Sequence, residues 1–201
     1  MLRLTPDDID EAVAILARGG IVVYPTETSY GMGCDATSAT AVARIFIIKD
    51  RPQVKGLSVL LPSFADATTY INLYPYTKRL AVHYWPGPLT IVASKMPTSP
   101  LAPLCENRGT HAVRVSSHPV AAVLARKLGR PIVATSANRS GRPDVYDPAQ
   151  IIATYGDSAE QPDAYIDAGV LPVVPPSTIV EVSTEGINIL RQGGIVVHKV
   201  W

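Results

Sequence analysis

The chain has 201 residues, of which 47% are hydrophobic and 17% are charged. This composition excludes a disordered chain and a coiled coil. The 18 Lys and Arg residues stand against 17 Asp and Glu residues, for a net charge of +1. Such a balance argues against a dedicated DNA-binding protein, which would be broadly basic. A chain of this length buries about 70% of its unfolded surface, so it needs neither a metal nor a disulfide to fold.

Two cysteines, Cys34 and Cys105, give neither a disulfide framework nor a zinc-ligand spacing. They predict reduced thiols in a cytoplasmic protein. The N-terminal residues lack the apolar core of a signal peptide, and no run approaches the ~18 apolar residues of a membrane span. We therefore expect a cytoplasmic protein without a membrane partner. Since no repeat or low-complexity tract divides the sequence, residues 1–201 are expected to form a single domain.

Helices are expected where a capping residue precedes apolar residues at three- and four-residue spacing. Their expected first residues are Thr5-Pro6, Ser38, Ser63, Pro119 and Asp147-Pro148. The first helix should end at Gly19-Gly20, and the helix that begins at Pro119 should end at Gly129.

Strands are expected where β-branched and aromatic runs are bounded by Gly or Pro. The runs are 21–24, 57–61, 89–93, 112–115, 131–135, 177–182 and 187–190. The proline-rich stretch 96–110 is expected to be a loop. Because helices and strands alternate without the even spacing of βαβ units, the predicted fold class is α/β or α+β. It should have one open, twisted, mixed sheet flanked by helices.

Common catalytic signatures are absent, but four polar segments stand out. The sequence has no P-loop, dinucleotide-binding fingerprint, zinc-protease motif or nucleophile elbow. The first polar segment, 24–31, clusters hydroxyls that could bind a small polar substrate, or could satisfy the backbone of their own turn. The second, 49–55, brackets Arg51 with Lys49 and Lys55. These cations could hold phosphate oxygens, or could serve the end of a helix dipole.

The third and fourth segments also favour anions. Arg114 lies within an apolar strand, where a half-buried arginine needs an anionic partner from the protein or from a ligand. Segment 134–142 combines hydroxyls, an amide and two arginines after a buried strand, which suits an anion pocket or a turn. Ser177 and Arg191 add a hydroxyl and a cation. Together these residues indicate a phosphate-bearing ligand, with a nucleotide as the favoured class.

The same segments resemble the YrdC family, the threonylcarbamoyl-AMP synthases. The matching pieces, in family order, are 24–28 with 30–31, 49–52 with Lys55, 85–90, 113–115, 136–138 with 140–141, 177–180 and 190–193. They extend over nearly the whole chain. The Lys-x-Arg and Ser-x-Asn pair is more similar to the synthases than to the related YciO branch. In three places the chain departs from the family: Ser29 replaces an apolar residue, Gly56 a proline, and Ser116 another proline.

The resemblance implies a twisted open sheet with a concave basic cavity. It also implies a nucleotidyltransferase that condenses L-threonine, bicarbonate and ATP to threonylcarbamoyl-AMP and pyrophosphate. A separate transferase complex would then modify tRNA, and Mg²⁺ would travel on the ATP phosphates, with no metal site in the protein. Lys49 and Arg51 would be catalytic. The implied ATP-binding residues are Lys49, Arg51, Lys55, Thr110, Ser136, Asn138 and Arg191. The implied threonine-binding residues are Thr26, Ser58, Arg114, Ala134 and Ser177.

Two other functions are compatible with the residues. A concave basic surface could bind double-stranded RNA or tRNA through phosphates, without catalysis. The balanced net charge and the lack of an aromatic platform weigh against that function. A nucleotide hydrolase, or a regulator that senses ATP and an amino acid, is the other alternative.

Overall fold

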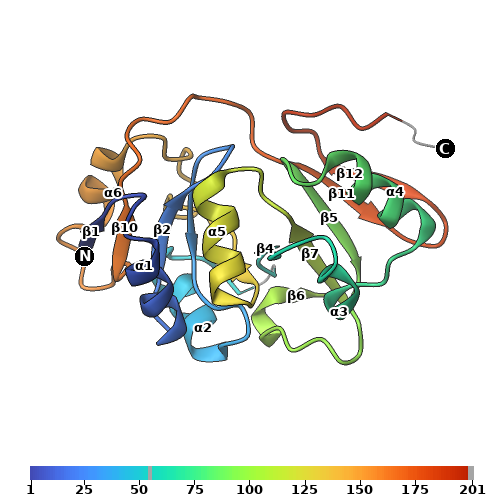
Figure 1. The fold of residues 1–201 in the computed structure, drawn as a ribbon, viewed down its shortest axis with the longest axis horizontal. Helices are drawn as coiled ribbons and strands as arrows, with labels where there is room; N and C mark the ends of the chain where they lie inside the picture. Colours follow the sequence, from blue (N-terminus) through green and yellow to red (C-terminus); the bar gives the residue numbers. More distant parts are fainter. Residues whose placement is uncertain (54–55, 199–201) are drawn as a thin grey trace.

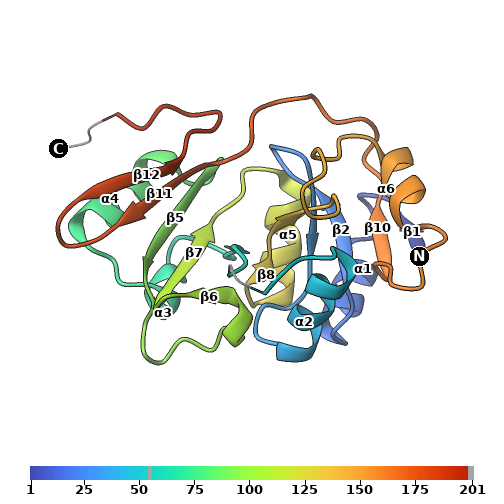
Figure 2. The same cartoon turned by 180° about the vertical axis from the view of Figure 1, so that it is seen from behind.

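The computed structural model describes residues 1–53 and 56–198. Its strands form two sheets, one in the half of the molecule that holds the N-terminus and one in the other half (Figure 1). The connection from β10 to β11 runs along one side of the molecule and joins the two halves, as the opposite view in Figure 2 also shows. The predicted class, a mixed α/β fold with twisted sheets and flanking helices, is confirmed, but the strands divide between two sheets.

The first sheet has the strand order β1-β10-β2-β3-β9. Its strands are β1 (Leu2–Leu4), β2 (Val22–Pro25), β3 (Tyr30–Gly33), β9 (Thr135–Ser136) and β10 (Ala164–Ile166). The pairs β1–β10 and β10–β2 are parallel, whereas β2–β3 and β3–β9 are antiparallel. The turn between β2 and β3 therefore lies at an end of this sheet, next to β9.

The second sheet has the strand order β12-β11-β5-β7-β4-β8, and β6 pairs with β7 outside this path. Its strands are β4 (Val59–Leu60), β5 (Leu89–Ser94), β6 (Glu106–Asn107), β7 (Thr110–Arg114), β8 (Ile132–Val133), β11 (Thr178–Val182) and β12 (Ile187–Arg191). Strands β11 and β5 are parallel and strands β5 and β7 are antiparallel. The buried Ile91, Val113 and Val180 explain why these segments form central strands.

Six α-helices surround the sheets in the described part of the chain. They are α1 (Ile9–Ala17), α2 (Ala39–Ile48), α3 (Ala67–Tyr70), α4 (Pro75–Tyr84), α5 (Pro119–Leu128) and α6 (Pro148–Tyr155). Helices α1 and α5 pack on each other and on the first sheet, where Leu16 and Leu124 join Val22 in one apolar cluster. None of the helices within the described ranges combines the length and the apolar character needed to cross a membrane.

Local capping signals predict most helix ends correctly. The Ser38 hydroxyl accepts the Ala41 N–H at the start of α2, Gly129 ends α5 with a φ of 67°, and Asp147 caps α6. The prediction at Thr5 is wrong. The Asp8 carboxylate accepts hydrogen bonds from the N–H and hydroxyl of Thr5, so a turn precedes a helix that begins at Ile9.

The Ser63 prediction is also wrong in detail. The Ser63 hydroxyl donates to the Asp66 carboxylate at 2.7 Å, and the first turn of α3 has no side-chain cap. The expected loop 96–110 contains a short 3₁₀ helix (Pro103–Cys105) and strand β6, which pairs with β7.

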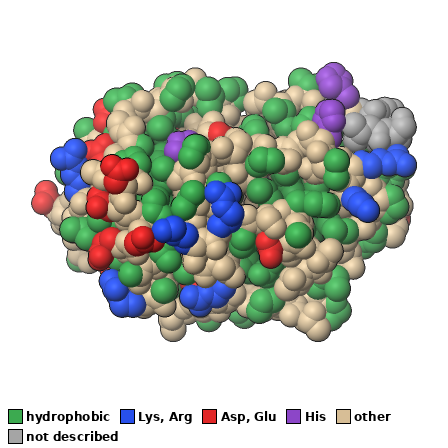
Figure 3. Space-filling model, viewed as in Figure 1, with side chains coloured by type: hydrophobic (Ala, Val, Ile, Leu, Met, Phe, Trp, Pro, Cys, Tyr) green, Lys and Arg blue, Asp and Glu red, His purple; other side chains and the backbone are tan. Residues whose placement is uncertain are grey.

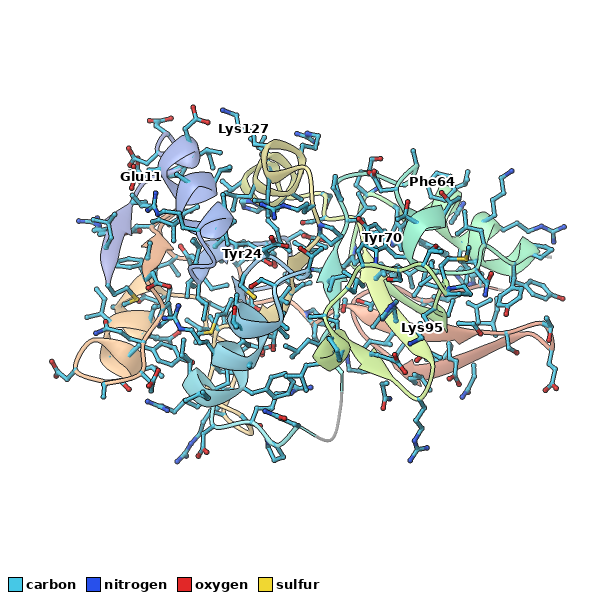
Figure 4. The ribbon with its side chains drawn as sticks, turned by 90° about the horizontal axis from the view of Figure 1, so that it is seen from below. Glu11, Tyr24, Phe64, Tyr70, Lys95 and Lys127 are labelled. Carbon is cyan, nitrogen blue, oxygen red and sulfur yellow. The ribbon has the colours of Figure 1, made fainter. Side chains whose placement is uncertain are left out.

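The expected strand 131–135 is divided between the two sheets. Ile132 and Val133 pair with β4, whereas Thr135 and Ser136 pair with β3. Ala134 lies between the two pairs, and its N–H donates to the Ser58 carbonyl at 2.7 Å. This crossover brings residues of both sheets to one place in the middle of the molecule. Tyr24, which Figure 4 labels in the half that holds the first sheet, donates its hydroxyl to the Val133 carbonyl at 2.9 Å.

Candidate functional site

A cavity of about 790 Å³ is lined by residues of both sheets. Its described lining includes four arginines (Arg51, Arg108, Arg114 and Arg191) and two carboxylates (Asp144 and Glu181). The predicted site residues that line it are Thr26, Arg51, Ser58, Thr110, Arg114, Ala134, Ser136, Ser177 and Arg191. Segments from nearly the whole chain thus converge on one cavity with a surplus of cations. Lys55 lies outside the described residues.

Thr26 uses its hydroxyl within its own turn. This hydroxyl donates to the Ser29 carbonyl at 2.7 Å and accepts the N–H groups of Thr28 and Ser29 at 3.1 and 3.2 Å. It also lies 3.0 Å from the Thr28 hydroxyl. Of the two interpretations of segment 24–31, the turn whose hydroxyls satisfy its own backbone therefore describes Thr26 well. Its hydrogen bonds fix the shape of this cavity wall, where Thr28 and Ser29 also lie.

Lys49, the residue that ends α2, lies beneath the loop that follows β9. Its side chain is buried, and Nζ donates to the backbone carbonyls of Ser136 and Asn138. Burial, and secondly the charge of Arg51, lowers the pKa of Lys49 from 10.5 to about 7, and Asp144 opposes this shift. In this structure Lys49 stabilises the loop through these backbone carbonyls and is not part of the described cavity lining.

The Asn138 side chain forms hydrogen bonds within the same loop. The Ser136 hydroxyl donates to the Asn138 side-chain oxygen, and the Asn138 amide donates to the Arg142 carbonyl. Asn138 is almost fully buried, whereas Ser136 lines the cavity. Of this Ser-x-Asn pair, the serine can therefore contact a ligand directly and the asparagine holds the turn.

Arg51 lines the cavity and has an unmet hydrogen-bonding group. Its Nε is buried and has no hydrogen-bond partner among the described residues, while its guanidinium lies 5.9 Å from the centre of the Phe46 ring. Burial lowers the pKa of Arg51. A half-buried arginine with a free donor suits an anionic ligand, because a charged hydrogen bond would offset the cost of its burial.

Arg191 and Ser177 are in direct contact. Arg191 donates through Nε and Nη2 to the Ser177 carbonyl at 3.0 and 2.8 Å, and through Nη2 to the Ser177 hydroxyl at 3.0 Å. That hydroxyl also lies 3.0 Å from the hydroxyl of Thr90. A residue predicted for the nucleotide and one predicted for the amino acid therefore form one hydrogen-bonded unit.

Arg114 ends β7 with its side chain 8% exposed. Its charged partner is Glu27, and 3.9 Å separates Arg114 Nη1 from Glu27 Oε1. No hydrogen bond joins the guanidinium to another described residue, so its donors are available to a ligand in the cavity that it lines. The partner that sequence reasoning left open as either protein or ligand is therefore present in the protein, at a distance too long for a hydrogen bond.

Sequence reasoning missed some cavity residues. Thr90, Arg108 and Asp144 line the cavity but were not predicted as site residues. Asp144 follows the fourth polar segment by two residues, and its charge acts on the pKa values of Lys49 and Arg191. Arg108 lies in the stretch expected to be a loop. Its φ of 50° places it in the tight turn between β6 and β7.

The buried Lys49 should make stability depend on pH. Between about 7 and 10.5 the folded chain binds fewer protons at Lys49 than the unfolded chain does, so the free energy of unfolding should rise with pH in that window. The cost of burying the charged amine is present in full below pH 7 and vanishes above 10.5. Urea unfolding across this window measures the slope.

The Lys49→Met variant should lose this part of the slope, whereas Lys78→Met, which changes an exposed lysine, should keep it. Equal slopes in wild type and Lys49→Met would contradict the assignment.

Comparison with known proteins identifies relatives of the chain in sequence and in fold. Residues 14–193 match the model of the Sua5/YciO/YrdC family, which carries the description "Telomere recombination". A threonylcarbamoyl-AMP synthase of Klebsiella pneumoniae is 37% identical over 159 residues, which cover 78% of this chain and 83% of that protein.

Two solved structures support the match. The crystal structure of P. abyssi Sua5 complexed with L-threonine has a TM-score of 0.86 at 31% identity. The match covers 96% of this chain but only 57% of that one. E. coli YciO has a TM-score of 0.82 at 27% identity and is covered to 93%, against 96% of this chain. The match over residues 14–193, together with the synthase relative, shows that the chain belongs to the Sua5/YciO/YrdC family.

Proposed function

We propose that the chain is a threonylcarbamoyl-AMP synthase, a nucleotidyltransferase that condenses L-threonine, bicarbonate and ATP. The observation that carries this proposal is the convergence of Arg51, Ser136 and Arg191 with Arg114 on one cavity. Such a cavity can seat a polyphosphate beside a carboxylate. The 37% identity to a synthase supports the same activity.

The ligand roles follow from position in the cavity and from the family resemblance. Arg51, Ser136 and Arg191 would bind ATP directly, with Thr110, and with Lys55 from outside the described residues. Lys49 and Asn138 would hold the Ser136 loop in place. Arg114 would bind the threonine carboxylate, while Ser58, Ala134 and Ser177, with the Thr26 turn, would enclose the rest of the amino acid.

The reaction requires no protein nucleophile. The amine of threonine adds to bicarbonate, with loss of water, to give a carbamate. A carbamate oxygen then attacks the α-phosphate of ATP, and pyrophosphate leaves. Arginines and hydroxyls in a concave site would act by positioning the reactants and by stabilising phosphate charge.

The cavity residues also fit a Mg²⁺ ion carried on the ATP phosphates. Mg²⁺ in nucleotide sites is commonly held by one or two carboxylates together with phosphate oxygens. Asp144 lines the cavity near the cationic side chains of Lys49 and Arg191, which its charge affects. Contrary to the expectation of no metal site in the protein, Asp144 would hold the ion, and the ion would supply further neutralisation of phosphate charge.

The product would pass to a separate transferase complex that modifies tRNA, in the cytoplasm. On the face in Figure 3 the Lys and Arg side chains are scattered, many of them beside Asp and Glu, so this face lacks the continuous basic patch that would favour direct RNA binding. A salt-dependent gel shift with tRNA would test that alternative.

The direct test supplies the purified protein with ATP, bicarbonate and threonine. We expect pyrophosphate release and a threonine-bearing adenylate detected by mass, with serine in place of threonine as the control. ATP turnover that does not depend on threonine would support a hydrolase instead, and absence of the adenylate would overturn the proposal.

A further inference from the structure

The buried Arg114 and the partly buried Glu27 are opposite charges that do not close into a hydrogen-bonded pair. Their side chains are 14% and 8% exposed, and 3.9 Å separates Glu27 Oε1 from Arg114 Nη1. A hydrogen bond between them would need a distance shorter by about 1 Å. Although Oε1 of Glu27 is buried, no described residue donates a hydrogen bond to it. Another contact must therefore keep the Glu27 carboxylate from moving closer to Arg114.

The Ser116 hydroxyl makes this contact. It donates to the other carboxylate oxygen, Oε2 of Glu27. Because an ionised carboxylate only accepts hydrogen bonds, the hydroxyl hydrogen must point to Glu27. The Ser116 oxygen in turn accepts the His118 N–H at 3.2 Å, and His118 Nδ1 accepts the Val120 N–H at 3.3 Å. This chain of hydrogen bonds fixes the Glu27 carboxylate to the first turn of α5.

The backbone of Glu27 is fixed as well. It lies in the turn that the Thr26 hydroxyl crosslinks through its bonds to Thr28 and Ser29. Glu27 can therefore approach Arg114 only by rotation of its side chain, and the bond from Ser116 opposes that rotation.

We propose that Ser116 is a positioning residue that tethers Glu27, so that Glu27 balances the charge of Arg114 without occupying its N–H donors. The donors then stay free for the carboxylate of the amino-acid substrate. A buried arginine without any counter-charge would be costly, whereas a closed ion pair would have to open before the substrate could bind. The tether avoids both states. This inference rests on the proposed function, because it assumes that Arg114 binds the threonine carboxylate.

The Ser116→Ala variant separates the tether from the charge. Once released, the Glu27 carboxylate is expected to rotate onto Arg114 and to compete with threonine. We expect the KM for threonine to rise about fivefold or more, which corresponds to about 1 kcal/mol. The kcat and the KM for ATP should stay unchanged. Pyrophosphate release at varied threonine concentration measures these constants, and calorimetric titration of threonine measures binding without turnover.

Matched variants distinguish the tether from a packing role. Ser116→Thr keeps the hydroxyl and should behave as wild type, and so should Ser117→Ala at the exposed neighbouring position. If Ser116→Ala does not fold, Ser116→Cys, a near-isosteric and weak donor, should raise the KM for threonine in the same direction.

A double-mutant cycle gives the decisive result. In a Glu27→Gln background the carboxylate that lies beside Arg114 is gone, so Ser116→Ala should then have little effect on the KM for threonine. An equal effect of Ser116→Ala in both backgrounds, or a wild-type KM for the single variant, would overturn the tether. A wild-type protein that makes no adenylate would instead overturn the proposed function.

Discussion

Replacing Arg114 by lysine is expected to weaken threonine binding by about 10- to 100-fold, the equivalent of about 1.4–2.7 kcal/mol. The planar guanidinium can face Glu27 on one side and offer two parallel donors to a substrate carboxylate on the other. A lysine ammonium is a point charge without this fork, so it cannot do both from the end of β7. Calorimetric titration of threonine measures the loss.

The Arg114→Lys variant should leave ATP binding nearly unchanged, because lysine keeps the positive charge that acts on Arg191 and the other groups assigned to the phosphates are untouched. Arg126→Lys, at an exposed position on α5, is the matched control and should bind threonine as wild type does. Wild-type threonine affinity in Arg114→Lys would remove Arg114 from the substrate site.

The second large effect is expected at Arg51. The Arg51→Ala variant should lose about 1.5–3 kcal/mol of nucleotide binding, the contribution of a charged hydrogen bond, and pyrophosphate release should fall with it. The reason is that Arg51 lines the cavity with a buried Nε that has no described partner. Titration of a non-hydrolysable ATP analogue measures the affinity separately from turnover.

Arg142→Ala provides the control for Arg51→Ala, since Arg142 is exposed and is not among the described residues that line the cavity. It removes the same charge from the protein but should leave nucleotide affinity intact. Equal losses in both variants would mean that net charge, and not the position of Arg51, governs binding.

Features that depend on neighbouring residues could be predicted from the sequence. The start of α2 at Ser38 and the end of α5 at Gly129 are set by bonds within a few residues, so a short window of sequence contains the whole cause. The candidate site segments can also be recognised from a short window, because clusters of polar residues directly after predicted buried strands are unusual.

Features that depend on distant residues could not be predicted. Strand β3 was missed because its glycines have a low strand propensity, and it forms only because β2 and β9 pair with it on both sides. Likewise, nothing in the sequence near Lys49 indicates that its amine turns to the carbonyls of Ser136 and Asn138, some 90 positions along the chain. Local sequence patterns therefore predict which segments form the candidate site, but not which of their groups line the cavity.

The crossover at Ala134 has a mechanical consequence for the cavity. Val133 is bound into one sheet and Thr135 into the other, with a single residue between them. A slip of one position in either pairing would reverse the direction of every side chain that follows. The cavity walls that the two sheets contribute are thus joined through Ala134, and a disturbance of either sheet would shift the cavity residues of both sheets together.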